Sequence, residues 1–197
     1  MEHAFYSIFK NNFWSSLHVN GPGSTTDASK DARYILTKVI EKYNIRSLVD
    51  APCGLYSWIG LINSPIEYIG VDIVKEQIDQ NTVKHKDKLF LHGNLAEGYP
   101  LQAKNKDLIF CRHLTQHLSS ETTLKVLNYF KESGCKYLLI TNYKNITKNS
   151  EVCEWKSYNC PELDKGAHRP QNLLLPPYSF GSLIEEFNEF ALFKLTS

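Results

Sequence analysis

The sequence has little net charge, no long apolar run and no paired cysteine motif, and each absence removes a class of protein. Lys and Arg number 22 against 21 Asp and Glu, so the formal net charge is +1 and no overall field attracts a nucleic acid. No apolar run reaches about 18 residues, and no basic region followed by an apolar stretch opens the chain. We therefore expect no membrane span, no signal peptide and no nucleic-acid partner.

The five cysteines form no C-x-x-C pair and are typical of reduced thiols, which favours an intracellular, cytoplasmic protein. No H-E-x-x-H segment occurs, and the spacing of histidines and acids supplies no ligand set for a metal, so none is expected. The 197 residues contain no internal repeat, low-complexity tract or linker, and their number suits a single domain that spans 1–197.

Two short apolar runs, each closing on a carboxylate, are the most informative feature that is present. The first ends at Asp50 and is followed by a turn with Pro52 and Gly54, and the second ends at Asp72, 22 residues after Asp50. A buried parallel strand delivers a polar group to its carboxyl end in this way, and ligands of open α/β sheets bind at that edge. An acid at an offset of roughly 20 residues reaches a nucleoside ribose in a βαβ unit. The pattern predicts an adenosine-containing cofactor.

The turn after Asp50 lacks the glycines of a dinucleotide-binding fold. A G-x-G-x-x-G turn lets backbone approach a pyrophosphate, whereas this turn has only Gly54 and carries Pro52 in place of the first glycine. A ligand without a pyrophosphate tolerates that loss, and S-adenosylmethionine (SAM) is such a ligand.

These motifs resemble those of the class I SAM-dependent methyltransferases, whose first motif reads apolar-apolar-acid-Ala-Gly-Cys-Gly and whose second ends on the ribose-binding acid. A small subgroup of that family carries Gly-Pro-Gly-Ser, Asp-Ala-Pro-Cys-Gly, Gly-Val-Asp-Ile-Val, Cys-Arg-Asp-x-x-x-His-Leu-Ser and Trp-Arg-Pro-x-Asn-Leu segments. Their counterparts here are Gly21–Ser24, Asp50–Gly54, Gly70–Val74, Cys111–Ser119 and His168–Leu173, so the resemblance covers nearly the whole chain.

The resemblance implies where SAM binds and where this chain departs from the family. The implied cofactor-binding positions are Asp50, Ala51, Pro52, Cys53, Gly54, Trp58, Asp72, Ile73, Asn94, Leu95 and Arg112. Asn94 stands where the family usually has an Asp that meets the adenine amine, so it keeps an acceptor oxygen but loses the charge. His113 replaces the Asp of the subgroup pattern and offers a titratable imidazole, and His168 replaces the Trp.

Apolar spacing and turn residues predict an α/β fold: a Rossmann-like, doubly wound sheet of six or seven mostly parallel strands with flanking helices, in a single domain. We expect strands at 47–50, 66–72, 89–92, 107–111 and 136–141, and a closing antiparallel strand at the sheet edge at 190–195. We expect helices at 4–14, 28–43, 57–62, 74–86, from 119 or 120 to 133, and at 183–188.

Residues 1–26 have two interpretations. Aromatic residues recur every four positions of the helix expected at 4–14, and this face either packs on the domain or serves as an N-terminal lid over the cofactor. The loop at 19–26 either forms a nest for an anion or is an ordinary linker. The resemblance favours the functional interpretation, in which Gly23 and Ser24 bind substrate.

The segment 143–172 shows no clear period and is long for a loop in a compact domain, so we expect it to be a substrate loop. Arg169 within it suits an anionic acceptor, or alternatively pairs with a nearby carboxylate that holds the loop down. Asn142 ends the preceding strand. Together with Gly23 and Ser24, these residues are expected to converge on a polar acceptor pocket at the carboxyl edge of the sheet.

Methyl transfer from SAM is an in-line displacement in which the protein mainly positions donor and acceptor. An oxygen or nitrogen acceptor also loses a proton, and the candidate catalytic bases are His113 and His168, with His117 as a less favoured third. The predicted function is transfer of a methyl group to a polar small molecule, for example a sugar or another hydroxylated or anionic metabolite.

Two alternatives stay open at this point. An RNA or DNA methyltransferase would carry a basic face or an N/D-P-P-Y/F motif after the fourth strand, where this chain has Cys111–Leu114. A SAM-binding partner protein without catalysis would show motif degeneration of the kind seen at Pro52 and Asn94. Turnover separates these functions.

Overall fold

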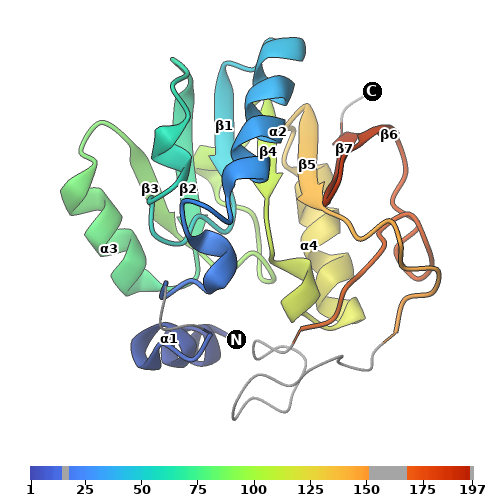
Figure 1. The fold of residues 1–197 in the computed structure, drawn as a ribbon, viewed down its shortest axis with the longest axis horizontal. Coiled ribbons are helices and arrows are strands. Elements are labelled where there is room, and N and C mark those ends of the chain that lie inside the picture. The colour runs from blue at the N-terminus through green and yellow to red at the C-terminus, as the bar shows by residue number, and fades with distance from the viewer. Residues whose placement is uncertain (15–17, 151–167, 196–197) are drawn as a thin grey trace.

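The computed structural model describes residues 1–14, 18–150 and 168–195, and their strands form one seven-stranded sheet (Figure 1). The strand order is β3-β2-β1-β4-β5-β7-β6. The strands are β1 Ser47–Asp50, β2 Glu67–Asp72, β3 Leu89–His92, β4 Leu108–Cys111, β5 Tyr137–Thr141, β6 Leu183–Glu186 and β7 Phe190–Lys194. The first five run parallel, while β7 pairs antiparallel with both β5 and β6. The predicted Rossmann-like fold of mostly parallel strands is confirmed.

Helices cover both faces of the sheet because each buried strand is apolar on both sides. The helices are α1 Glu2–Asn11, α2 Lys30–Lys42, α3 Lys75–Lys84 and α4 Ser120–Glu132, with single 3-10 turns at Pro22–Ser24, Ile59–Leu61, Leu101–Ala103 and Thr115–His117. Leu48 of β1 packs in the core layer with α2, and its neighbour Val49 packs in the opposite layer with α4. This alternation along a strand produces the doubly wound, three-layer arrangement.

The helix expected at 57–62 is wrong. Only one 3-10 turn, Ile59–Leu61, forms there, and the Ser57 hydroxyl donates to the carbonyl of Leu55 instead of capping a helix. The segment is anchored from outside by the Tyr56 ring, which packs edge-on against Tyr68 at 4.8 Å between centroids. Tertiary packing therefore decides this short connection over local helical preference.

The helix expected at 183–188 is also wrong, because residues 183–186 form β6. Strand β7 offers a second row of backbone hydrogen-bonding groups, and β6 pairs with it through a register shift between Leu183 and Glu185. Glu185 is held there by Lys42 of α2, with 2.7 Å between Nζ and Oε2. The strand at 190–194 is antiparallel as predicted but internal, since β6 is the edge.

The antiparallel direction of β7 sets where its preceding turn lies. Thr141, at the carboxyl end of β5, is opposite Phe190 at the start of β7, and the Asn142 N–H donates to the Glu189 carbonyl at 2.9 Å. The β6–β7 turn therefore lies at the same edge of the sheet as the carboxyl ends of the parallel strands. None of the helices that the structure describes is both long and apolar enough to cross a bilayer.

Candidate functional site

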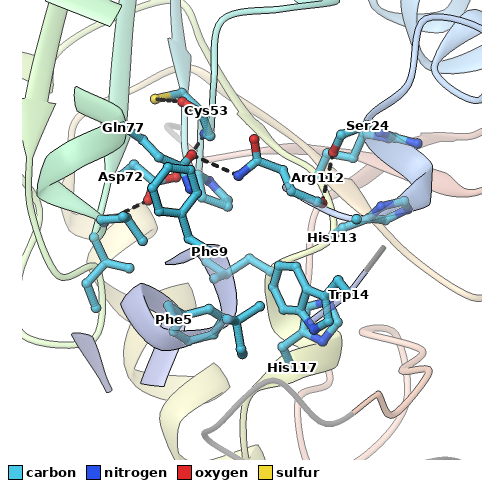
Figure 2. A pocket seen from close by; sticks show the side chains of 18 of the residues that line it. Phe5, Phe9, Trp14, Ser24, Cys53, Asp72, Gln77, Arg112, His113 and His117 are labelled. Atoms are coloured by element: carbon cyan, nitrogen blue, oxygen red, sulfur yellow. Dashed lines mark hydrogen bonds between the residues drawn. The ribbon is translucent and has the colours of Figure 1, made fainter. Parts of the chain in front are cut away.

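A cavity of about 340 Å³ lies at the carboxyl edge of the parallel strands (Figure 2). Asp50 ends β1, Asp72 ends β2 and Arg112 follows β4, and all three side chains line it. The sheet order places β2 and β3 on one side of β1 and β4 on the other, so the cavity lies at the topological switch point where open α/β sheets bind ligands.

The turn after β1 is fixed by backbone hydrogen bonds that it donates to both neighbouring strands. The N–H of Ala51 donates to Phe110 in β4 at 2.9 Å, and that of Cys53 donates to Val71 in β2 at 2.9 Å. Gly54 has φ 51°, and a Cβ there would lie 3.0 Å from the Asn20 side chain, so the position requires glycine. The Gly54 N–H then donates to Asp72 Oδ2 at 2.8 Å, which joins the two sequence motifs.

Asn20 lies in the loop at 19–26, but the sequence does not single it out as a site residue. Its side chain accepts from the Leu55 N–H at 3.1 Å and donates to Gln77 Oε1 at 2.8 Å, so it ties the N-terminal segment to the Gly54 turn and to α3. Its partners are 35 and 57 positions away in sequence, and no local pattern signals such a bridge.

Asp50 and Asp72 are both buried, and burial shifts both of their pKa values upwards. Burial raises the pKa of Asp50 to about 8; Asp72 adds to the shift, while the hydrogen bond from Tyr68 and the charge of Arg112 oppose it. Burial also raises the pKa of Asp72, while hydrogen bonds from the backbone N–H groups of Val74 and Gly54 oppose this rise. Two poorly solvated carboxyl groups in one cavity favour a ligand that carries positive charge.

Arg112 contributes a guanidinium group to the cavity wall. Its Nη1 donates to the Gly23 carbonyl at 2.9 Å, and its charge lies 5.3 Å from the centre of the Trp58 ring. Burial lowers its pKa, and the nearby Glu189 carboxylate opposes that shift. Its Nε is buried and forms no hydrogen bond with the described residues, although Glu189 Oε1 is 3.6 Å away.

His113 is held beside Arg112 in an unusual backbone conformation. It has φ 56°, its N–H donates to Thr141 Oγ1 at 3.0 Å, and its Nε2 lies 3.5 Å from Glu189 Oε2. A Cβ on Gly23 would lie 3.1 Å from its Cε1, so the glycine permits the ring to pack against the loop. Burial lowers the pKa of His113, and Glu189 opposes the shift.

The aromatic face of the N-terminal segment forms the opposite wall. Phe5 and Phe9 of α1 line the cavity, and Trp14 stacks on His117 with 4.9 Å between ring centroids (Figure 2). The helix is tied down at Glu2, whose carboxylate is 3.1 Å from His92 Nε2. This aromatic face therefore packs on the domain and contacts the cavity at the same time; whether it opens and closes as a lid stays a prediction.

Most predicted site residues lie together in this cavity. Those that line it are Gly23, Ser24, Asp50, Pro52, Cys53, Gly54, Trp58, Asp72, Ile73, Asn94, Leu95, Arg112, His113 and His168. Ala51 does not, because it is fully buried behind the turn. The Asn94 side chain closes its own turn, accepting from the Ala96 N–H at 3.1 Å and donating to Glu97 at 2.7 Å.

Arg169 and Asn142, which the sequence analysis expects to bind substrate, do not line the cavity. Arg169 is 1% exposed and donates to the carbonyls of Leu118 and Ser150, so its guanidinium is engaged within the protein. The Asn142 Oδ1 accepts from the Leu173 N–H at 2.7 Å. Of the expected substrate loop 143–172, residues 151–167 lie outside the described part of the chain.

No group of three or more His, Cys, Asp or Glu within the described ranges is arranged to hold a metal ion. Cys53, Cys111 and Cys135 are buried free thiols. The chemistry available in the cavity is therefore that of carboxylates, a guanidinium, imidazoles and aromatic walls.

Neither a protein-family model nor a curated protein matches the sequence. Solved structures match the fold. A structure described as a DhpI complex with S-adenosylhomocysteine (SAH) matches over 97% of this chain and 94% of its own, with a TM-score of 0.64 and 13% identity. The PH0226 protein of Pyrococcus horikoshii OT3 matches over 88% and 95%, with a TM-score of 0.56 and 14% identity. Magnesium protoporphyrin IX methyltransferase of Synechocystis PCC 6803, solved with SAH, matches over 71% and 67%, with a TM-score of 0.52 and 12% identity. At these identities the likeness shows the fold, which this chain shares with SAM-dependent methyltransferases.

Proposed function

We propose that this protein is a SAM-dependent methyltransferase that acts on a small molecule. The observation that carries the proposal is the convergence of Asp50, Gly54, Asp72 and Arg112 on one cavity at the switch point of a methyltransferase fold. The two acids suit the positive charges of SAM, and the guanidinium suits its carboxylate.

Each part of the cofactor has a residue of matching chemistry in the cavity wall. Asp72 would accept from the ribose hydroxyls, since each carboxylate oxygen has a second lone pair besides the one used by Gly54 or Val74. Arg112 would hold the methionine carboxylate, and Asn94 with Leu95 would border the adenine. SAM itself supplies the sulfonium leaving group, so the protein's task is to position the acceptor and remove its proton.

The acceptor that we propose is a hydroxylated small molecule with an apolar part. The polar groups of the cavity come from the strand ends, whereas α1 and Trp14 supply aromatic walls. The expected cation for an anionic acceptor, Arg169, is engaged elsewhere, which removes the reason to favour an anion. No observation favours RNA or DNA, because the net charge is only +1.

The test combines cofactor binding with turnover. Calorimetry should detect SAH binding to the wild type, and Asp72→Asn should weaken it about tenfold or more, because a neutral amide replaces a charged acceptor. Asp79→Asn is the matched control, since Asp79 is exposed and pairs with its helix neighbour Lys75. A second assay follows SAH release from SAM with pooled sugars, other alcohols, amines and tRNA.

The outcomes separate the candidate functions. Absence of SAH binding by the folded wild type would refute the proposal outright. Binding without turnover on any pool would favour the non-catalytic partner protein, and release of SAH with tRNA alone would favour the nucleic-acid enzyme. Turnover with an alcohol or amine pool supports the function proposed here.

A further inference from the structure

Glu189 belongs to none of the sequence motifs, yet its carboxylate lies between the two polar side chains that follow β4. Oε1 is 3.6 Å from Arg112 Nε, and Oε2 is 3.5 Å from His113 Nε2. The Glu189 side chain is 29% exposed and that of His113 is 28% exposed. The β6–β7 turn thus places an acid directly behind an imidazole that lines the cavity.

The His113 ring is fixed on several sides. Its backbone is held by Thr141, Glu189 faces Nε2, and the ring packs against Gly23, whose Cβ position would lie 3.2 Å from Nδ1. With Nε2 directed at the carboxylate, the neutral ring carries its proton on Nε2 and leaves Nδ1 as the acceptor. Nδ1 lies beside Gly23, which itself lines the cavity.

We propose that Glu189 is a positioning residue that orients His113 as the general base, so that Nδ1 removes the proton of an O–H or N–H methyl acceptor. This inference rests on the proposed methyltransferase function and deepens it, because it names the class of acceptor atom and assigns the base. His168, the other candidate, packs its ring against His117 and Tyr143, at 6.1 Å from each centroid.

The chemistry balances without a further reactant. The bond between the methyl carbon and the sulfonium sulfur breaks, and its electron pair remains on sulfur as the neutral thioether of SAH. A lone pair of the acceptor oxygen or nitrogen forms the new bond to the methyl carbon, while the acceptor proton moves to His113 Nδ1. One positive charge therefore passes from the sulfonium to the imidazolium, where Glu189 offsets it.

The charged groups around His113 are consistent with this role. Burial lowers the pKa of His113, Glu189 opposes that shift, and the charge of Arg112 adds to it, so the ring is neutral and able to accept a proton near pH 7. Burial works against ionisation of Glu189, but His113 and Arg112 outweigh it, and its pKa lies below the usual range. A neutral base beside an ionised acid is the arrangement that the step requires.

The first test is histidine-labelled NMR of the SAH complex. In the wild type, the His113 ring should titrate below 6.5 and be protonated on Nε2 at pH 7. In Glu189→Gln, the pKa of His113 should fall further, because the stabilising anion is lost. Glu185→Gln is the matched control, because Glu185 lies on the adjoining strand and pairs with the surface residue Lys42. A His113 ring protonated on Nδ1, or a His113 pKa that is the same in Glu189→Gln and wild type, would overturn the proposal.

The second test is turnover with an acceptor found in the alcohol and amine pools. Activity should fall as pH drops through the pKa of His113, and Glu189→Gln should shift this limb to lower pH while reducing kcat about tenfold or more. His113→Gly, which suits the positive φ, should lose about 100-fold in kcat and regain part of it when imidazole is added. SAH binding is measured in parallel. If Glu189→Gln binds SAH and turns over with an unshifted acid limb of the pH–rate profile, this inference alone is refuted. If the wild type does not bind SAH, the proposed methyltransferase function itself is refuted.

Discussion

Gly23 illustrates how a single hydrogen atom in place of a side chain shapes the site. Its absent Cβ would lie 3.1 Å from His113 Cε1, closer than ordinary packing allows, although the backbone itself can accommodate alanine. We expect Gly23→Ala to displace the ring by a few tenths of an ångström and to lower turnover about tenfold, with little effect on stability. Gly181→Ala is the control, because a Cβ at Gly181 has no atom within 4 Å. Equal activity of the two variants would contradict this.

The position of Arg169 predicts a role in stability, because its side chain is buried and does not line the cavity. Its guanidinium donates to the carbonyls of Leu118 and Ser150 and to the hydroxyl of Ser120 at the start of α4, and of these partners Leu118 is buried. Arg169→Ala should therefore cost about 3 kcal/mol in the free energy of unfolding, measured by urea titration, because a buried acceptor loses its donor. The exposed Arg46→Ala should cost about 0.5 kcal/mol or less. A stable Arg169→Ala variant with a raised acceptor KM would restore the substrate role.

The sequence indicates a site residue when the residues it works with are close to it along the chain. Asp50, Gly54 and Asp72 were found because strand, turn and acid are contiguous in the chain and leave a readable pattern. Asn20 and Glu189 were missed, because their partners are brought close only by the folded sheet. Arg169 is indicated as a residue but its hydrogen-bond partners are not, since a charge in a loop does not reveal which carbonyl groups lie near it in the fold.

At the scale of elements, α1 is the piece whose role an experiment can resolve. Its inner face contributes Phe5 and Phe9 to the cavity wall, and Trp14, beyond its end, stacks on the ring of His117. Trp14→Ala should weaken SAH binding about fivefold or more in calorimetry, because part of the apolar wall is lost. Tyr6→Ala, on the outer face and 40% exposed, should bind SAH like the wild type. An unchanged affinity in Trp14→Ala would make this wall irrelevant to the cofactor.

The elements that pattern reasoning misassigned are short ones. Residues 57–62 and 183–186 are each too brief for a period to decide between helix and other structure, and long-range contacts settle both. The longer helices α2 and α4 and the five parallel strands have strong apolar patterns, and the structure has them within a few residues of the predicted bounds.

For the whole molecule, the pH dependence of stability is set in part by Asp50. Its pKa rises from the ordinary 3.8 to about 8 on folding, so the folded chain holds this proton more tightly than the unfolded chain. Stability from this group is therefore greatest below about pH 4 and is lost as pH rises to about 8.

Asp50→Asn removes this titration and should be more stable than the wild type at pH 8.5 by at least about 1 kcal/mol in urea unfolding without cofactor. At pH 5 the difference should be smaller, and SAH binding should be weaker than in the wild type. Asp79→Asn should follow the wild-type pH dependence. A wild type that gains stability between pH 5 and pH 8.5 relative to Asp50→Asn would contradict the assignment.

Because β7 is antiparallel, the turn before it brings Glu189 to His113, and Glu189 is synthesised late in the chain. The pairing of the proposed base with its carboxylate therefore has to wait for this part of the chain. A ribosome makes Glu189 76 residues after His113, which at roughly 5–20 residues per second is a delay of about 4 to 15 s. During that interval the turn at Gly54, the acids Asp50 and Asp72, and His113 are already part of the nascent chain, but Glu189 is not. In the proposed mechanism, a chain still under synthesis is thus unable to transfer methyl groups at the mature rate until the β6–β7 hairpin pairs with β5.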